Sequence, residues 1–125
     1  MIKPGELRLN NSVISKCHQG LITEVRDLSP TSLKLWANPF ANYKYEDIDP
    51  IPLTPEILQK CGFPETKGLW YEHEISSFFL DGSGNFFAGE VLNVDSPVIA
   101  KNIKYLHQLQ NLYFMLTGSE LTVNL

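Results

Sequence analysis

The sequence of 125 residues has no long apolar segment and only two cysteines. No stretch approaches the roughly 18 apolar residues of a membrane-spanning helix, and residues 1–12 hold no apolar segment of signal-peptide length. Cys17 and Cys61 are far apart in the sequence, and a reducing compartment keeps such residues as thiols. We therefore expect an intracellular protein that has no disulfide bonds and does not associate with membranes.

Basic residues are also scarce. The chain has 10 Lys and Arg against 14 Asp and Glu, which gives a net charge of −4, and no two basic residues are adjacent. A dedicated nucleic-acid binder normally has a basic excess or a basic stripe, so we do not expect nucleic acid as a partner. A local basic pocket formed by folding remains compatible with this composition. Hydrophobic residues make up 43% of the chain, enough for a core, and we expect a single domain over residues 1–125.

The sequence lacks common catalytic and metal-binding motifs, including the Walker A and H-E-x-x-H motifs. The segment Asp81–Asn85 begins like a calcium-binding loop, but Phe86 and Leu92 stand where that loop needs Gly and Glu. A hairpin turn is the simpler interpretation. On a strand, the two glutamates that flank His73 would face away from the imidazole. We therefore expect no metal site, no cofactor and no catalytic residue.

Short β-strands are predicted in the N-terminal part of the chain. Residues 7–15, 20–28 and 32–37 hold alternating or β-branched stretches. The segments between them contain Gly20 and Pro30 and are typical of turns. Strands of this length fit a small bent sheet or partial barrel, and we assign residues 1–46 to it.

A short helix is predicted over residues 55–61, where the local signals are unusually complete. Thr54 is a good N-cap, and Pro55 stands at the first helical position, where its missing N–H costs little. Gly62 follows the predicted last residue, and Phe63 is positioned to fold back on the helix, as in a Schellman ending.

The rest of the second part, residues 47–125, is predicted to hold a hairpin, a long helix and a final strand. The hairpin spans residues 69–94, the helix about 99–117, and the strand 121–125. The fold class is therefore α+β. It consists of a small bent N-terminal sheet or partial barrel, a short capped helix, and a β-hairpin packed on a long C-terminal helix.

Aromatic residues gather near the end of the first sheet and on the predicted hairpin. Planar rings beside Arg or Lys suit stacking on a base or another ring. Ordinary core packing and cross-strand pairing are the alternative. The predicted ligand-binding residues are Arg26, Trp36, Tyr43, Lys44, Trp70, Tyr71 and His73.

The polar side of the long helix has no charged residue. From Tyr105 to Gly118 there is no Lys, Arg, Asp or Glu. A chargeless helix face is easier to remove from water than one that bears Lys and Glu. This face either hydrogen-bonds the rest of the same chain or contacts a second copy. We assign His107, Gln108 and Asn111 to self-association and predict a homo-oligomer.

Three segments resemble a family of small uncharacterised proteins that occur in gut bacteria, in their phages and in mobile elements. Residues Ile103–Val123 resemble the C-terminal signature YLHQLQNLYF-LTG-EL, Ile48–Phe63 the middle segment, and Glu6–Val13 the opening strand motif. Asn10 and Met115 depart from the Gly and Ala that are usual in the family. The resemblance implies an accessory role for a phage or mobile element in the cytoplasm of a bacterial host cell. It carries over no catalytic residue.

Three functional hypotheses follow. The first is a non-enzymatic counter-defence protein that binds and sequesters a small nucleotide signal, of cyclic or ADP-ribose type, through its aromatic and basic residues. The second is a protein–protein interaction adaptor that uses the long helix or the first sheet. The third is a nucleotide-processing enzyme with His73 or His107 as its base.

Overall fold

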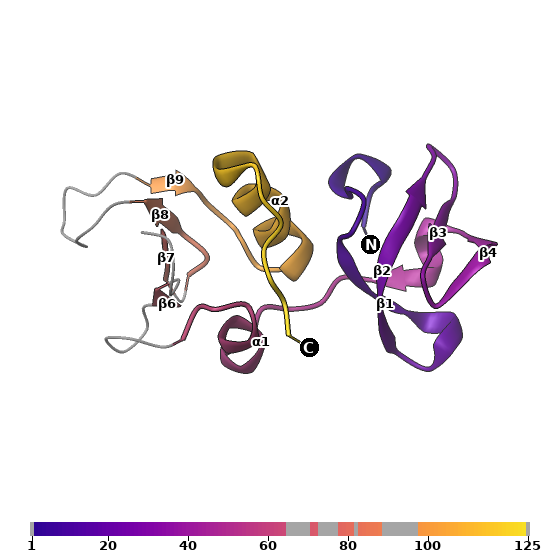
Figure 1. Ribbon diagram of the computed structural model, residues 1–125, viewed down its shortest axis with the longest axis horizontal. Helices are drawn as coiled ribbons and strands as arrows, with labels where there is room; N and C mark the ends of the chain where they lie inside the picture. The colour runs from indigo at the N-terminus through magenta and orange to yellow at the C-terminus, as the bar shows by residue number, and fades with distance from the viewer. Residues whose placement is uncertain (1, 65–70, 73–77, 82, 89–97, 125) are drawn as a thin grey trace. The chain divides into compact units, whose positions relative to one another are not determined.

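The computed structural model describes residues 2–64, 71–72, 78–81, 83–88 and 98–124 (Figure 1). The chain divides into two compact units. Unit 1 comprises Met1–Pro52 and Tyr105–Ser119, and unit 2 comprises Leu53–Lys104 and Glu120–Leu125. This division differs from the one expected at residue 46, which placed the long helix in the second part of the chain. The structure groups this helix with the N-terminal sheet.

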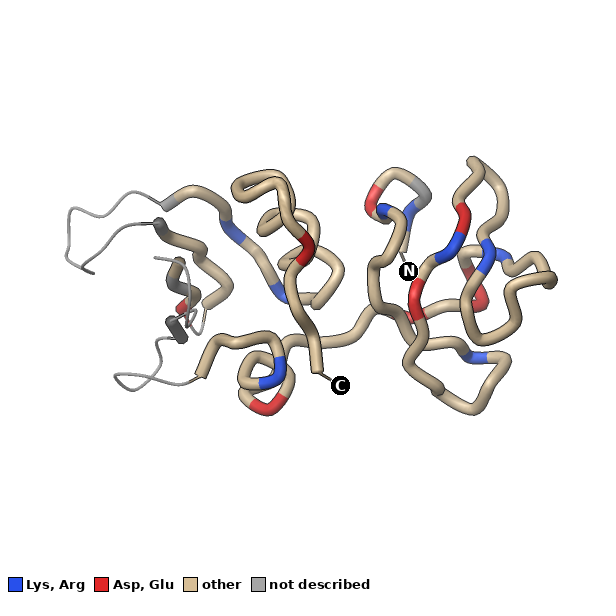
Figure 2. Tube along the Cα trace, in the orientation of Figure 1, with Lys and Arg blue, Asp and Glu red and all other residues tan. Residues whose placement is uncertain are grey.

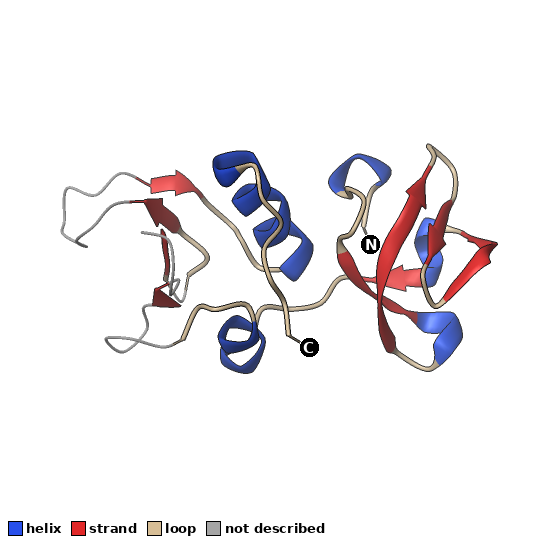
Figure 3. Cartoon of the chain, viewed as in Figure 1, coloured by secondary structure: helices blue, strands red, loops and turns tan. Residues whose placement is uncertain are grey.

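Unit 1 contains a five-stranded antiparallel sheet with the strand order β4-β3-β2-β1-β5 (Figures 1 and 3). The sheet is partly curled, and its described strands do not close into a barrel, so the prediction of a small bent sheet is confirmed. The strands are β1 (Ser12–Ser15), β2 (Leu21–Leu28), β3 (Leu33–Leu35), β4 (Asn38–Tyr43) and β5 (Ile48–Asp49). Three short 3-10 helices accompany them, η1 (Pro4–Glu6), η2 (Lys16–His18) and η3 (Tyr45–Asp47).

The first four strands follow one another through short turns. Gln19 and Gly20 both have positive φ values, 57° and 79°, and they reverse the chain between β1 and β2. A turn in which the Ser29 N–H donates to the Ser32 carbonyl at 2.9 Å joins β2 to β3. Strands β4 and β5 were not predicted, because Asn, Asp and Pro are disfavoured in strands. Pro39 is tolerated in β4 because this strand lies at the edge of the sheet.

One face of the curled sheet forms the core of unit 1. Leu33 and Leu35 alternate with the more exposed Lys34 and are buried, as expected of a strand with one face against the core. Tyr45 is also buried, and its hydroxyl donates to the Ser29 carbonyl at 2.7 Å. The buried core residues are Ile2, Leu7, Val13, Val25, Leu33, Leu35, Tyr43, Tyr45 and Ile48.

The long helix α2 (Leu106–Thr117) begins later than predicted. The start near residue 99 is wrong, because Val98–Ala100 form strand β9 and Asn102 has a positive φ of 60°. The Gln108 side chain caps the first turn by accepting the Tyr105 N–H at 3.1 Å. The predicted end is confirmed, since Gly118 has a φ of 73° and its N–H donates to the Phe114 carbonyl at 2.8 Å.

In unit 2 the short helix α1 (Pro55–Lys60) forms as its sequence signals predicted. The Thr54 hydroxyl accepts the Ile57 N–H at 3.2 Å. At the other end Gly62 has a φ of 83°, and the Phe63 N–H donates to the Leu58 carbonyl at 2.8 Å. These contacts satisfy backbone groups that a helix of this length leaves unpaired at both ends.

Unit 2 also contains a four-stranded antiparallel sheet with the order β6-β7-β8-β9. Its strands are β6 (Tyr71–Glu72), β7 (Phe78–Leu80), β8 (Phe86–Ala88) and β9 (Val98–Ala100). The Asp81 carboxylate holds the β7–β8 turn by accepting the Ser83 and Asn85 N–H groups, both at 2.9 Å. The predicted final strand is wrong for residues 121–124, which are not in a sheet. In that segment the Asn124 N–H donates to the Lys60 carbonyl at 2.9 Å.

Candidate interaction surface

Two of the predicted ligand-binding residues, Arg26 and Trp36, lie together on unit 1. Arg26 stands on β2 at an irregularity where the pairing with β3 shifts between Val25 and Asp27. The centre of its guanidinium lies 5.2 Å from the centroid of the Trp36 ring. A cation over an exposed indole contributes on the order of 0.5–1 kcal/mol. The pairing is therefore a modest local stabilisation that fixes the direction of both side chains.

Trp36 occupies the turn between β3 and β4, and the backbone of this turn is attached to β2. The Trp36 N–H donates to the Glu24 carbonyl at 3.0 Å, and the next N–H, of Ala37, donates to the Thr23 hydroxyl at 3.0 Å. Arg26 also reaches β4, where its Nη1 donates to the Pro39 carbonyl at 3.4 Å. Backbone and side-chain contacts thus hold the indole beside the start of β4.

Phe40 follows on β4 and is the most exposed large apolar residue in the described part of the chain, at 90%, while Trp36 is 55% exposed. Single exposed apolar residues are common on soluble proteins. Here Arg26 on β2 contacts both the Trp36 ring, in the turn between β3 and β4, and the carbonyl of Pro39, the residue before Phe40 on β4. We call Arg26, Trp36 and Phe40 the aromatic surface.

The structure places Tyr43 and Lys44 outside this surface. Tyr43 is a core residue, and its hydroxyl is hydrogen-bonded to the His18 Nε2 at 2.7 Å. Burial raises the pKa of Tyr43 above its ordinary value, and the neighbouring Cys17 adds to that rise. Lys44 is exposed, with its Nζ 3.9 Å from the Glu46 carboxylate. Tyr43 is therefore part of the core of unit 1, and its contact with a ligand stays a prediction.

The remaining predicted ligand-binding residues lie in the hairpin region. Trp70 and His73 fall outside the described residues. Tyr71 belongs to strand β6, of which the backbone is described. Their role in ligand binding stays a prediction.

The polar side of α2 is bonded within unit 1. Gln110 is 4% exposed, and its Oε1 accepts the Ser12 N–H at 2.8 Å while its Nε2 donates to the Ser12 hydroxyl at 3.3 Å. The Asn111 amide accepts from Asn11 Nδ2 at 2.8 Å and donates to the Glu6 carbonyl at 2.9 Å. We call Asn11, Ser12, Gln110 and Asn111 the amide cluster. It attaches the helix to β1 and to the residues before it.

His107 is also part of this contact, since it is only 1% exposed and its Nε2 lies 3.4 Å from the Glu6 carboxylate. Burial lowers the pKa of His107, and the hydrogen bond to Glu6 and the charge of that residue oppose the lowering. His107 is thus buried within the chain, and its predicted roles in self-association and as a base stay predictions. His107 and Asn111 thus make the contacts expected if the polar face of the helix bonds the rest of the same chain. The homo-oligomer itself stays a prediction, and Gln108 acts as the cap of the first turn of α2.

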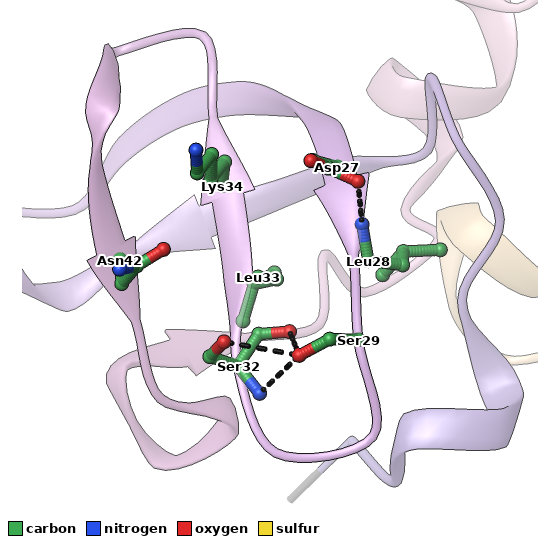
Figure 4. Close-up of a pocket in the computed structure, with 7 residues that line it drawn as sticks. All are labelled: Asp27, Leu28, Ser29, Ser32, Leu33, Lys34 and Asn42. Atoms are coloured by element: carbon green, nitrogen blue, oxygen red, sulfur yellow. Dashed lines mark hydrogen bonds between the residues drawn. The ribbon is translucent and has the colours of Figure 1, made fainter.

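A shallow depression of about 100 Å³ lies beside the turn between β2 and β3 (Figure 4). Several of its polar groups bond one another. The Ser29 hydroxyl accepts the Ser32 N–H at 3.1 Å, and the Asp27 carboxylate accepts the Leu28 N–H at 2.9 Å. Pockets for small molecules usually measure roughly 300–1,000 Å³, so this depression does not enclose a nucleotide. Its lining residues are Asp27, Leu28, Ser29, Ser32, Leu33, Lys34 and Asn42.

The described residues hold no group of three or more His, Cys, Asp or Glu side chains placed to share a metal ion. Cys61 is buried, and burial raises the pKa of its thiol to about 12. A thiol with that pKa is a poor nucleophile near neutral pH. None of the helices in the described ranges has the length and apolar character needed to cross a bilayer.

The sequence and the fold were compared with protein-family models, with curated proteins and with solved structures, and none of the three comparisons gives a match.

Arg26 and Trp36 were predicted from residue type alone, and their binding role stays a prediction. Phe40 belongs to the aromatics near the end of the first sheet but was not among the predicted ligand-binding residues, and the pairing of Gln110 with Ser12 was not predicted. The signal for Phe40 is the chargeless run from Leu35 to Tyr43, which predicts an uncharged surface once its strand is known to lie at an edge. For Gln110 and Ser12 no local signal exists, since 98 positions separate the two residues.

Proposed function

We propose that this protein is a non-enzymatic binding module that engages a partner protein through the aromatic surface of unit 1. The observation that carries the proposal is the exposure of Phe40 and Trp36, with Arg26 over the Trp36 ring and bonded to the carbonyl of Pro39, the residue before Phe40. Aromatic residues and Arg are enriched at protein interfaces and among the residues that dominate binding energy. The surface is open, which suits a protein partner better than a small ligand that must be enclosed.

The chemistry of Arg26 indicates what such a partner presents. Its guanidinium lies over an indole, and no carboxylate pairs with it among the residues that the structure describes. Arg presents five N–H donors in a fork that matches a carboxylate, and Arg26 uses one nitrogen on the Pro39 carbonyl. We therefore expect a partner segment that places an Asp or Glu beside apolar side chains.

A capture experiment with a matched control tests this function. Tagged wild-type protein, Trp36→Ala and Met115→Ala are each incubated with lysate of the cells in which the protein occurs. Met115 is 80% exposed on α2 and stands outside the aromatic surface. The expected result is one stoichiometric partner retained by wild type and by Met115→Ala and lost from Trp36→Ala. The proposal fails if no stoichiometric partner appears, or if Trp36→Ala retains it.

A second candidate function, nucleotide sequestration, is favoured by the same pair of residues. An exposed indole beside a guanidinium suits a base that stacks and a phosphate that accepts hydrogen bonds. Thermal denaturation with a panel of cyclic and ADP-ribose-type nucleotides tests it, since a ligand at 100 times its Kd adds about 2.7 kcal/mol of stability. A shift that Trp36→Ala abolishes supports this function. No shift with any nucleotide removes it.

The biological setting stays part of the proposal. The resemblance to proteins of phages and mobile elements supports an accessory role in the cytoplasm of a bacterial host, with counter-defence as its most concrete form. Expression in a host that carries a nucleotide-signalling defence is expected to raise phage titre, and Trp36→Ala is expected to abolish the gain. Incubation of the protein with candidate nucleotides separates binding from catalysis, because a binder returns the compound unchanged on denaturation.

A further inference from the structure

Strand β4 lies at an edge of the five-stranded sheet, and in the described ranges it pairs only with β3. A free strand edge is a template for further pairing, and proteins usually protect it with charges, especially Lys. The run from Leu35 to Tyr43 contains no charged residue, and the tube of β4 is tan along its length in Figure 2. Pro39 has no backbone N–H, so the strand has one donor fewer. None of the β4 side chains carries a charge that would oppose pairing with a second strand.

The side chains of β4 alternate in a nearly symmetric pattern. Asn38, Phe40 and Asn42 are exposed, while Pro39 and Ala41 are half-buried. The sequence Asn-Pro-Phe-Ala-Asn reads almost the same in both directions about Phe40. In an antiparallel pair of two copies centred on Phe40, each Asn38 lies opposite the Asn42 of the other copy, and the two Phe40 residues lie opposite each other.

We propose that β4 pairs with β4 of a second copy of this chain, antiparallel and centred on Phe40. The inference rests on the proposed function, because it assigns an occupant to one part of the aromatic surface. A two-fold interface requires a patch that is complementary to itself. Two facing phenyl rings flanked by amide pairs meet this requirement, since an amide both donates and accepts.

The absence of charge favours this occupant over an unrelated strand. Because β4 has no charged side chain of its own, it offers no ion pair to a charged partner strand, whereas a second β4 matches it in length and polarity. Among the strands that the structure describes, β4 is the one that is both chargeless and six residues long. One pair of six-residue strands buries less surface than stable interfaces do, so we expect a weak dimer that forms as the concentration rises.

Disulfide trapping tests the register directly. Directly opposed residues of an antiparallel pair have Cα atoms about 4.5–5.5 Å apart, which a disulfide bridges. The two Asn38 residues would lie four positions apart along the strands, about 13 Å at 3.3 Å per residue, beyond the reach of a disulfide. In a Cys17→Ser background, which removes the exposed native thiol, oxidised Phe40→Cys is expected to form a covalent dimer. Asn38→Cys alone is expected not to, but it should cross-link when mixed with Asn42→Cys.

Sedimentation equilibrium over a concentration series measures the uncrosslinked protein. Wild type is expected to shift from monomer to dimer, and Phe40→Lys to remain monomeric. The control Met115→Lys places the same charge on another exposed apolar site, on α2, and should dimerise like wild type. Circular dichroism checks that each variant folds. If Phe40→Lys unfolds, Asn42→Lys replaces it, because Asn42 is an exposed residue of β4 that would lie opposite Asn38 of the second copy.

Three results overturn the inference: a wild-type monomer at every concentration, a dimer that does not cross-link through Phe40→Cys, or equal cross-linking through Asn38→Cys. Failure here is distinct from failure of the proposed function. A monomer that still captures a partner through Trp36 refutes the β4 pairing alone. A cross-linked dimer that captures no partner protein refutes the binding function alone.

Discussion

Removal of the Gln110 amide is expected to cost more stability than any other substitution of a polar residue on α2. Gln110 is buried, and its Oε1 accepts the Ser12 N–H at 2.8 Å. Ser12 is itself buried at the start of β1. Gln110→Ala removes the acceptor, leaves that backbone N–H without a partner, and removes the donor to the Ser12 hydroxyl.

The magnitude follows from the desolvation of the orphaned donor. A buried N–H that loses its partner costs about 1–3 kcal/mol, and the truncated side chain leaves a small cavity that adds to the loss. We expect a total of roughly 2–4 kcal/mol. Domains of this size are stable by about 5–15 kcal/mol, so the loss is a large fraction of the free energy of unfolding.

Urea denaturation followed by circular dichroism measures this loss. With a slope of about 2 kcal/mol per molar urea, in the middle of the usual range, the midpoint should fall by roughly 1–2 M. Met115→Ala, at a largely exposed position of the same helix, should change stability by less than about 0.5 kcal/mol. If Gln110→Ala is no more harmful than Met115→Ala, then α2 is not attached to β1 through the amide cluster, and our explanation of the chargeless face is refuted.

Three further outcomes follow from individual residues. Because burial lowers the pKa of His107 below its ordinary 6.5, protonation favours the unfolded chain, so stability should be full above about pH 6.5 and fall as the pH drops toward the folded pKa. His107→Gln should flatten that part of a stability–pH curve, and an unchanged slope contradicts the assignment. Gly84 has a φ of 84°, and an added Cβ would lie 3.0 Å from a backbone oxygen, whereas Gly20 has a φ of 79° and open space around it. Calorimetry should therefore show Gly84→Ala to be clearly more destabilising than Gly20→Ala, with a cost above about 1 kcal/mol, and equal costs would rule out the close approach. The buried Cys61, with a thiol pKa of about 12, should resist iodoacetamide at pH 8 under conditions that alkylate the exposed Cys17, as mass spectrometry of the intact protein would show.

Helix α1 was predictable because its signals are local. Thr54, Pro55 and Gly62 lie within one or two residues of the helix ends, and each acts on backbone groups beside it. The start of α2 was not predictable in this way. The apolar run Val98–Ala100 suits a helix as well as a strand, and its pairing with β8 determines that it is β9.

The candidate site was predictable in residue type and not in arrangement. Trp36 and Tyr43 are both aromatic residues near the end of the first sheet, and the sequence does not distinguish them. The fold buries Tyr43 at the end of β4 and exposes Trp36 in the turn before that strand. The register of the sheet also shifts between β2 and β3 and again between β3 and β4. A shift of one position reverses the face of every later side chain, so local spacing does not fix which ring is exposed.

The amide cluster also explains why the polar side of α2 carries no charge. A buried Lys or Glu at the position of Gln110 would need a partner of opposite charge, and the group that faces this side chain is a neutral backbone N–H with a serine hydroxyl. An amide satisfies both groups without a charge to desolvate. The helix face that suggested contact with a second copy is thus used within the chain. Strand β4 also has no charged residue, and its Phe40 is 90% exposed. Self-association is therefore best tested at β4.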